Sequence, residues 1–265
     1  MNQAQDRPAP TSAQQRIDEF HSAWVRKPVL RHIYGDYYQR IMRALSPGPT
    51  LEIGSGPGNL KASLPDVVST DITYSPWTDI VADAQRLPFA DQSFANIVAV
   101  DVLHHLPHPV CFFHEASRVL AAGGKVVLLE PAITPISWVF YRWCHPELVD
   151  MRVDPLRPDQ LSSDQPFDAN QAIPSLLFGK YLDSFQAKFP SFVLANKQYL
   201  SLFAYPLSGG FRPWSLIPKK LVAPLLRIED WVNPVFGKLC AFRLFVVLVN
   251  RRVTAKGNAY INEGC

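Results

Sequence analysis

The stretch Thr50-Leu51-Glu52-Ile53-Gly54-Ser55-Gly56-Pro57-Gly58-Asn59 decides the fold of this 265-residue chain. A short apolar run leads into a loop with glycine at alternate positions. Glycine lets a backbone turn tightly after a strand and lets a ligand approach the main chain, because it has no Cβ. The pattern predicts a strand, a ligand-binding loop and then a short helix over 59–64, whose N-terminal amides would point into the loop.

After this loop, short apolar runs typical of strands alternate along the chain with segments of helical periodicity. We expect the strands of a core at residues 51–53, 67–71, 80–81, 94–100 and 125–130. A helix over 109–120 precedes the last of them, and a glycine-containing segment over 121–124 closes that helix. Beyond the core we expect a helix over 171–189 and strands over 191–203 and 242–249. Buried strands separated by helices are typical of a doubly wound α/β fold.

Acidic residues stand where several of these strands end. Asp71 closes the second strand, 19 positions after Glu52, and a carboxylate there can accept both hydroxyls of a ribose. Glu52 can anchor the ammonium group of a ligand, directly or through water. Solvation at the strand end is the plain alternative for each carboxylate. A nicotinamide-binding G-x-G-x-x-G loop would need glycine at position 59, where the chain has Asn59, so that class is disfavoured.

Four segments carry a family resemblance: LEIGSGPGNL (51–60), STDI (69–72), DAQRLPFADQSFANIVAVDVLHHL (83–106) and EASRVLAAGGKVVLLEP (115–131). Together they resemble class I S-adenosylmethionine-dependent methyltransferases, closest to the group that includes the ubiquinone/menaquinone biosynthesis enzymes. The resemblance implies a Rossmann-like, seven-stranded, mostly parallel sheet whose last strand is antiparallel, and S-adenosyl-L-methionine as the cofactor. It also implies that the N-terminal helices fold over the cofactor as a lid.

The combined evidence of loop, strand ends and resemblance predicts the cofactor contacts. They are Glu52, Gly54, Ser55, Gly56, Gly58, Asp71, Ile72, Asp83, Ala84, Asp101 and Tyr34. By resemblance Asp83 faces the adenine amino group, the Ala84 amide a ring nitrogen and Ile72 the adenine face, while Asp101 lies beside the methionine portion. Tyr34 of the lid would contact the cofactor carboxylate, with a packed aromatic face as the alternative.

His104 and His105 follow the fourth strand, at the edge where open α/β sheets bind ligands. A histidine there can serve as general base for a hydroxyl nucleophile, so both are candidate catalytic residues; packing beside the cofactor is the alternative. Methyl transfer from a sulfonium depends mainly on positioning and exclusion of water. No metal-ligand spacing is visible along the chain, so we expect no metal.

Composition is that of a globular protein, with 48% hydrophobic and 12% aromatic residues. The net charge of +3 is too small to indicate a nucleic-acid partner. The N-terminus has no apolar signal core, and the apolar run over 241–249 is too short to span a bilayer. The four cysteines show no metal-ligand or C-x-x-C spacing. We therefore expect a cytoplasmic protein with free thiols. The sequence leaves the oligomeric state open.

We expect one domain over 16–252 between tails at 1–15 and 253–265. It comprises a helical lid divided by Pro28 (16–45), the cofactor-binding core (50–130), an insertion rich in aromatic residues and then in Pro and Asp (131–169), and a helical cap between the last two strands (206–239). The cap has apolar residues at helical spacing, five basic and two acidic residues, and hence a net charge of +3. This pattern predicts a contact with the inner membrane surface or a lid over an apolar substrate. The alternative is a plain helical cap packed on the sheet or at a dimer interface.

The segment YPLSGGF (205–211) and the basic cap also resemble, less specifically, bacterial methyltransferases of surface-polysaccharide and lipid-linked glycan assembly. We therefore expect methyl transfer, at oxygen, to a small or lipid- or sugar-linked acceptor. The segment DVLH over 101–104 is not the signature used on nucleic-acid amines, which argues against DNA bases. Two alternatives remain: a non-catalytic assembly partner that kept the fold, and a membrane-surface adaptor acting through the cap.

Overall fold

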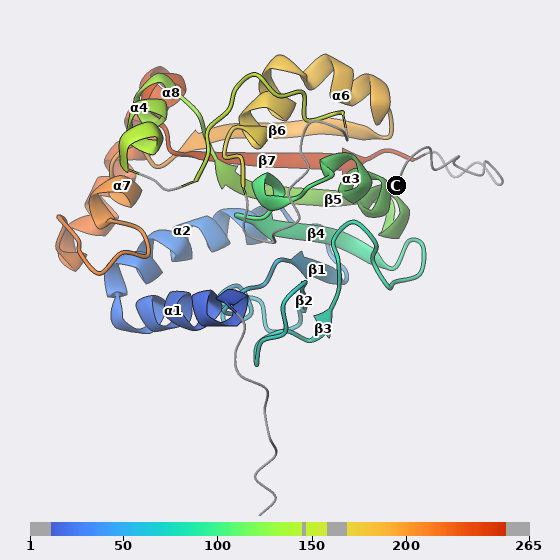
Figure 1. Ribbon diagram of the computed structural model, residues 1–265, viewed down its shortest axis with the longest axis horizontal. Coiled ribbons are helices and arrows are strands. Elements are labelled where there is room, and N and C mark those ends of the chain that lie inside the picture. Colours follow the sequence, from blue (N-terminus) through green and yellow to red (C-terminus); the bar gives the residue numbers. More distant parts are fainter. Residues whose placement is uncertain (1–11, 145–146, 158–168, 253–265) are drawn as a thin grey trace, which may run out of the picture.

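The computed structural model describes residues 12–144, 147–157 and 169–252 (Figure 1). Over these residues it has one seven-stranded sheet in the order β3-β2-β1-β4-β5-β7-β6. The strands are β1 (Thr50–Ile53), β2 (Val68–Asp71), β3 (Ile80–Val81), β4 (Phe94–Val100), β5 (Leu120–Pro131), β6 (Phe192–Leu200) and β7 (Arg243–Asn250).

Strands β1 to β5 pair in parallel, and β7 lies antiparallel between β5 and β6. The predicted fold class, a doubly wound, mostly parallel sheet with an antiparallel last strand, is therefore confirmed. The strand order reverses at β1 and β4, which are neighbours in the sheet. The carboxyl ends of strands at such a reversal form the crevice where open α/β sheets bind ligands.

Helices cover both faces of the sheet. They are α1 (Ser12–Arg26), α2 (Pro28–Ala44), α3 (Pro109–Val119), α4 (Pro135–Cys144), α5 (Ile173–Ser175), α6 (Leu182–Lys188), α7 (Ala204–Ser208) and α8 (Val222–Cys240). Short 3₁₀ turns, η1 (Leu103–His105) and η4 (Lys219–Leu221), and a π-helical turn, η3 (Leu176–Lys180), complete the set.

Alternating residues of the central strands pack into two separate hydrophobic cores, one on each face of the sheet. Val126 of β5 packs with α3 and α6 in one buried cluster, whereas its neighbour Val127 packs with α2 in the other. Strand side chains alternate between the two faces of a sheet, so a continuous apolar run fills both cores. This is why the near-unbroken apolar runs of β4, β5 and β7 were recognisable as strands.

Several local predictions need correction. Residues 56–63 form successive turns and not the helix expected over 59–64. Gly58, which has a left-handed φ of 68°, precedes this segment, and Pro65 follows it and biases Leu64 away from helical backbone angles. The helix expected over 171–189 is broken into α5, η3 and α6, and residues 121–124 belong to β5.

The ends of the predicted parts also differ. Helix α1 begins at Ser12, inside the segment expected as a tail, while Pro28 opens α2 as the sequence predicts. The remaining tail residues and part of the insertion lie outside the described residues. Cys240 is a free, buried thiol, but Cys111 is disulfide-bonded, so the expectation of free thiols is wrong for Cys111. No helix of the described chain is long and apolar enough to cross a bilayer.

Candidate cofactor and acceptor site

A cavity of about 920 Å³ opens at the carboxyl ends of β1, β2 and β4. Residues of α1 and α2 form one wall, and the segment after α7 forms another, with Phe211 and Trp214 at its rim. Every predicted site residue lines this cavity except Gly58. The sequence thus located the cavity, although the part each residue plays there stays a prediction.

The three glycines of the loop have different physical roles. A Cβ on Gly54 would lie 2.4 Å from Val102, and one on Gly58 would lie 2.5 Å from Trp77. All three glycines have positive φ, at 66°, 48° and 68° for Gly54, Gly56 and Gly58, so all three serve the turn, and Gly54 and Gly58 also allow close packing. A Cβ on Gly56 would meet nothing within 4 Å, so this glycine leaves open space for a ligand beside the backbone.

Asp71 ends β2 with its carboxylate turned back toward the loop. One oxygen accepts the Gly56 amide at 2.9 Å and the other accepts the Thr73 amide at 2.8 Å. Burial raises the pKa of Asp71, and these two backbone donors act against that rise. The carboxylate therefore joins the glycine loop to β2 and keeps acceptor capacity toward the cavity.

Glu52 is 5% exposed and lies beneath the loop. Its carboxylate accepts the Ser69 hydroxyl at 2.8 Å. Burial raises the pKa of Glu52 to about 7. The Ser69 hydrogen bond lowers this pKa, whereas the negative charge of Asp71 raises it further. Glu52 forms no ion pair with another described residue, although the charge of Lys61 acts on it from a distance. Such a buried carboxyl suits the predicted ammonium anchor, because a ligand cation would offset its cost of ionisation.

The predicted adenine end of the cavity lies next to β2 and β3. Asp83 accepts the Gln85 amide at 2.8 Å, and Ala84 beside it is buried. Ile72 is an apolar side chain left 55% exposed at the cavity, where it can lie against the face of a ring. Ile72, Asp83 and Ala84 all line the cavity, as their predicted contacts with one adenine ring require.

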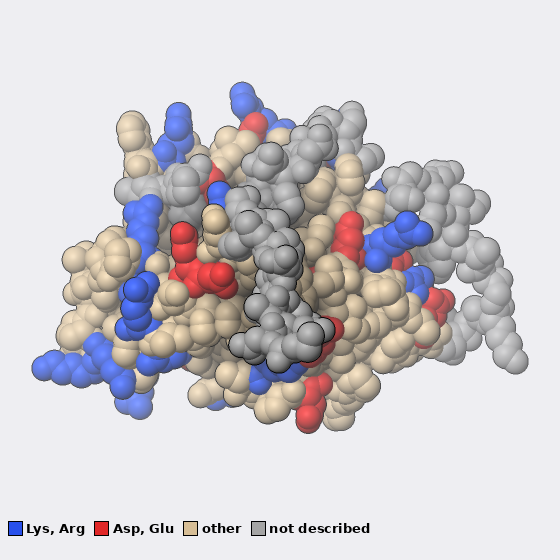
Figure 2. Space-filling view, turned by 60° about the horizontal axis from the view of Figure 1, so that its bottom comes forward, with Lys and Arg blue, Asp and Glu red and all other residues tan. Residues whose placement is uncertain are grey.

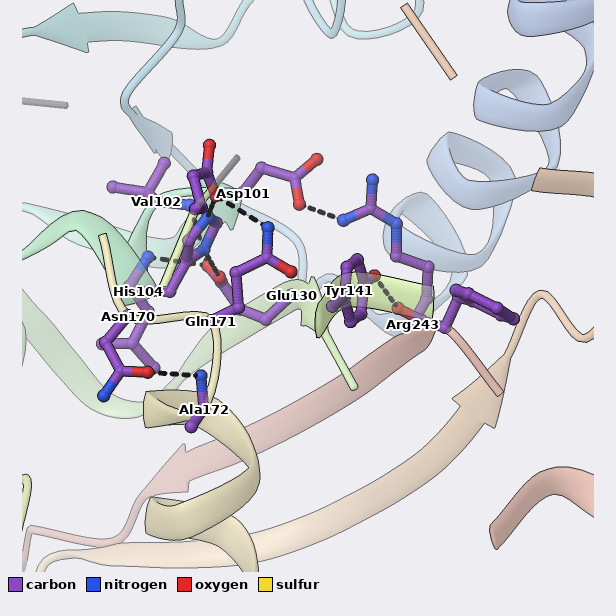
Figure 3. Close-up of polar contacts among 12 residues, drawn as sticks. Asp101, Val102, His104, Glu130, Tyr141, Asn170, Gln171, Ala172 and Arg243 are labelled. Atoms are coloured by element: carbon purple, nitrogen blue, oxygen red, sulfur yellow. Dashed lines mark hydrogen bonds and ion pairs between the residues drawn. The ribbon is translucent and has the colours of Figure 1, made fainter. Parts of the chain in front are cut away.

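The sequence did not identify Arg243, which is 3% exposed at the start of β7. It forms an ion pair with Asp101 (Figure 3). Its guanidinium also lies 4.2 Å from the centre of the Tyr205 ring and donates to the Tyr34 hydroxyl at 3.4 Å. The Tyr34 hydroxyl donates to Asp101 at 3.2 Å. Residues from β4, α2, α7 and β7 therefore share one polar cluster on the cavity wall, and Tyr34 belongs to it.

His104 and His105 stand on η1 with their rings 4.1 Å apart. Nδ1 of His104 lies 2.6 Å from Glu130, whose other oxygen accepts the amides of Val102 and Leu103 (Figure 3). Burial alone would lower the pKa of His104, but the hydrogen bond and charge of Glu130 outweigh it and raise that pKa. A raised pKa leaves more of the imidazole protonated near neutral pH, and the protonated ring cannot accept a proton as a general base.

Glu147 and Gln171 complete this end of the cavity, and neither was singled out by the sequence. A Glu147 oxygen lies 3.7 Å from Nε2 of His104 and accepts the Gln171 amide group at 2.7 Å. Glu147 comes from the insertion after α4, more than 40 positions beyond His104. No local pattern relates such distant residues, so only the folded chain shows them as neighbours.

Known proteins resemble the chain over this same core. Residues 51–128 match the family described as Methyltransferase domain. The ubiquinone/menaquinone biosynthesis C-methyltransferase UbiE of Bordetella avium is 28% identical over 152 residues, covering 46% of this chain and 59% of that protein. The 27-O-demethylrifamycin SV methyltransferase of Amycolatopsis mediterranei is 39% identical over 54 residues, 20% of each chain. The matched regions thus span less than two thirds of the length of these relatives.

A solved structure shares the fold more widely. The SAM-dependent methyltransferase of Thermotoga maritima, a possible histamine N-methyltransferase, aligns with a TM-score of 0.53 and 16% identity over 84% of this chain and 91% of that one. With this strand order the chain has the fold of S-adenosylmethionine-dependent methyltransferases, and its glycine loop lies within the segment that matches a methyltransferase domain. Within that class it is similar to the UbiE-like group.

Proposed function

We propose that this protein transfers the sulfonium methyl group of S-adenosyl-L-methionine to an oxygen of an acceptor bound in the same cavity. The observation that carries the proposal is the meeting of the matched motif residues around one large cavity at the strand reversal. The open space at Gly56, the Asp71 carboxylate and the exposed Ile72 fit the backbone-side, ribose and adenine parts of this cofactor.

The cofactor supplies an activated methyl group, and the residues of the chain supply its position. Asp71 would hold the ribose, Glu52 the ammonium and Asp83 the adenine amino group. In the transfer the carbon–sulfur bond breaks, a carbon–oxygen bond forms, the cofactor leaves as a neutral thioether and the acceptor proton passes to solvent. Such a reaction depends on alignment and on exclusion of water, which the α1–α2 wall of the cavity would supply.

The experiment is a calorimetric titration of the full chain with S-adenosylhomocysteine, followed by incubation with S-adenosyl-L-methionine and candidate acceptors. Micromolar binding and a product heavier by one methyl group would support the proposal. Failure of the cofactor product to bind would overturn it. Binding with no turnover on any lipid-linked sugar, quinol or small alcohol would favour a non-catalytic scaffold instead.

We further propose a lipid-linked acceptor presented at an anionic membrane surface. The phenylalanine and tryptophan side chains that line the cavity are Phe20, Phe140, Phe211, Trp214 and Phe242. Such a lining suits an apolar chain better than a free sugar. The acceptor would then enter from the side of the molecule that carries α4, α7 and α8.

The outer surfaces of α4 and α8 support this orientation. Of the 19 residues of α8 only Val222, Glu229, Gly237 and Cys240 are buried. Large apolar side chains on the two helices stay exposed: Ile136, Trp138, Val139, Trp143, Ile228, Trp231, Val235, Phe236 and Leu239. Lys and Arg side chains gather at the same end of the molecule, at the left of Figure 2. Exposed tryptophans beside basic residues are typical of helices that lie on anionic bilayers.

A further inference from the structure

Three potential metal ligands meet at the end of the cavity formed by η1. His104, His105 and Glu147 each offer one donor atom, and these atoms all lie within 4.8 Å of one another. The separation of His104 Nε2 and the Glu147 oxygen is 3.7 Å. Two ligands of a tetrahedral zinc ion are about 3.3 Å apart at ordinary bond lengths. Shortening the separations between donors by up to about 1.5 Å would therefore bring all three onto one ion.

The groups behind these donors are arranged as they are around metals. A ligating histidine typically gives its second ring nitrogen to a carboxylate, which fixes the tautomer and the ring plane. Glu130 does this for His104 at 2.6 Å, and the Val102 and Leu103 amides hold Glu130 in turn. Gln171 likewise holds the Glu147 carboxylate at 2.7 Å. Nε2 of His104 is thereby oriented toward Glu147.

We propose that His104, His105 and Glu147 form a binding site for a divalent transition-metal ion of the Zn²⁺ type. Two imidazoles and one carboxylate are a donor set that such ions prefer, and three protein ligands leave coordination positions for another molecule. All three residues line the cavity, so those positions face it. This site was not expected from the sequence, which contains no closely spaced ligand motif.

The ion would hold an oxygen of the methyl acceptor, a role that rests on the proposed function. The site follows β4 directly, so it lies beside Asp101, which lines the cavity with it. Coordination lowers the pKa of a bound hydroxyl and fixes its direction. The two histidines then act as ligands, and the acceptor needs no histidine to remove its proton.

The test is calorimetric titration of untagged, chelator-treated full-length protein with ZnCl₂, repeated with CoCl₂ for its absorption spectrum. We expect one site, and a loss of affinity of at least about 100-fold in both His105→Ala and Glu147→Gln. Glu130→Gln, which removes only the orienting carboxylate, should cost about 10- to 100-fold. His108→Ala is the matched control, because His108 lines the cavity but lies outside the cluster.

Two results would overturn the site: no metal binding by the intact protein, or equal affinity in wild type, His105→Ala and Glu147→Gln. Both substituted residues are partly exposed, so their variants should fold, and circular dichroism checks this. Titration with S-adenosylhomocysteine in the metal-free protein separates the two proposals. Cofactor binding without metal binding would leave the methyltransferase proposal intact and remove the metal site alone.

Discussion

Arg243 at the start of β7 forms an ion pair with Asp101 at the end of β4, across 142 positions of sequence. Asp101 adopts a positive φ of 59°, a backbone conformation that is uncommon for a residue other than glycine. Tyr34 and Tyr205 lie against the same guanidinium. The pair therefore connects the carboxyl edge of the sheet with both the N-terminal helices and α7, which wall the cavity.

Removing the charge of Asp101 should destabilise the protein. Asp101→Asn leaves the buried guanidinium of Arg243 without its ion-pair partner, and we expect a loss of about 2–4 kcal/mol in the free energy of unfolding. The partial exposure of Asp101 keeps the loss below that of a fully buried pair. Urea unfolding without ligand measures it. Asp230→Asn, which breaks the more exposed pair with Arg40, should cost less than about 1 kcal/mol; equal losses would contradict the argument.

Removing the Asp71 carboxylate should weaken cofactor binding. Asp71→Ala is expected to cost about 1.5–3 kcal/mol of binding free energy for S-adenosylhomocysteine, or roughly 10- to 150-fold in Kd, because a charge-assisted hydrogen-bonding partner is lost. Calorimetric titration provides the measurement. Asp66→Ala, at an exposed position before β2, should bind as wild type does. Unchanged affinity in Asp71→Ala would place the ribose elsewhere.

Stability should decrease as pH rises because of Glu52. Its pKa is raised from the ordinary 4.5 to about 7 by burial, so the folded protein favours the protonated form. This contribution is fully present below pH 4.5 and is lost as pH rises through about 7. Between about pH 5 and about pH 8.5 the loss should be about 2–3 kcal/mol.

The measurement is the free energy of unfolding by urea at both pH values in wild type and Glu52→Gln. The variant should lack this part of the pH dependence, whereas Asp66→Asn, at an exposed position, should keep it. A parallel pH dependence in wild type and Glu52→Gln would show that Glu52 is ionised in the folded protein at low pH.

Membrane association should depend on the exposed face of α8. Trp231 and Val235 are 83% and 75% exposed, and replacing both with serine removes about 2–3 kcal/mol of apolar transfer energy. We expect at least about tenfold weaker flotation with vesicles containing anionic lipid. Val81→Ser, at an equally apolar site on β3 at the far edge of the sheet, is the control. Unchanged flotation, together with dimers in solution that the double substitution dissociates, would identify a protein interface instead.

Local pattern accounts for the part of the fold that was predicted correctly. The strand over Phe94–Val100 was placed to the residue, because a run of apolar residues buried on both faces is a feature of the sequence itself. The turns over 56–63 were missed, because so short a segment has too few internal contacts for its own propensity to decide its structure. The broken helix at η3 was missed for a similar reason, since packing overrides periodicity there.

The sequence by itself determined the class of fold and the glycine loop with its acidic strand ends, because each depends on residues within one strand–turn unit. Only the tertiary structure decided that Arg243 meets Asp101 and that Glu147 meets His104. These contacts join strand ends and loops that the sheet order brings together across long stretches of chain. Ion pairs and metal ligands act over a few ångströms of space, and distance along a chain carries no information about them until the chain has folded.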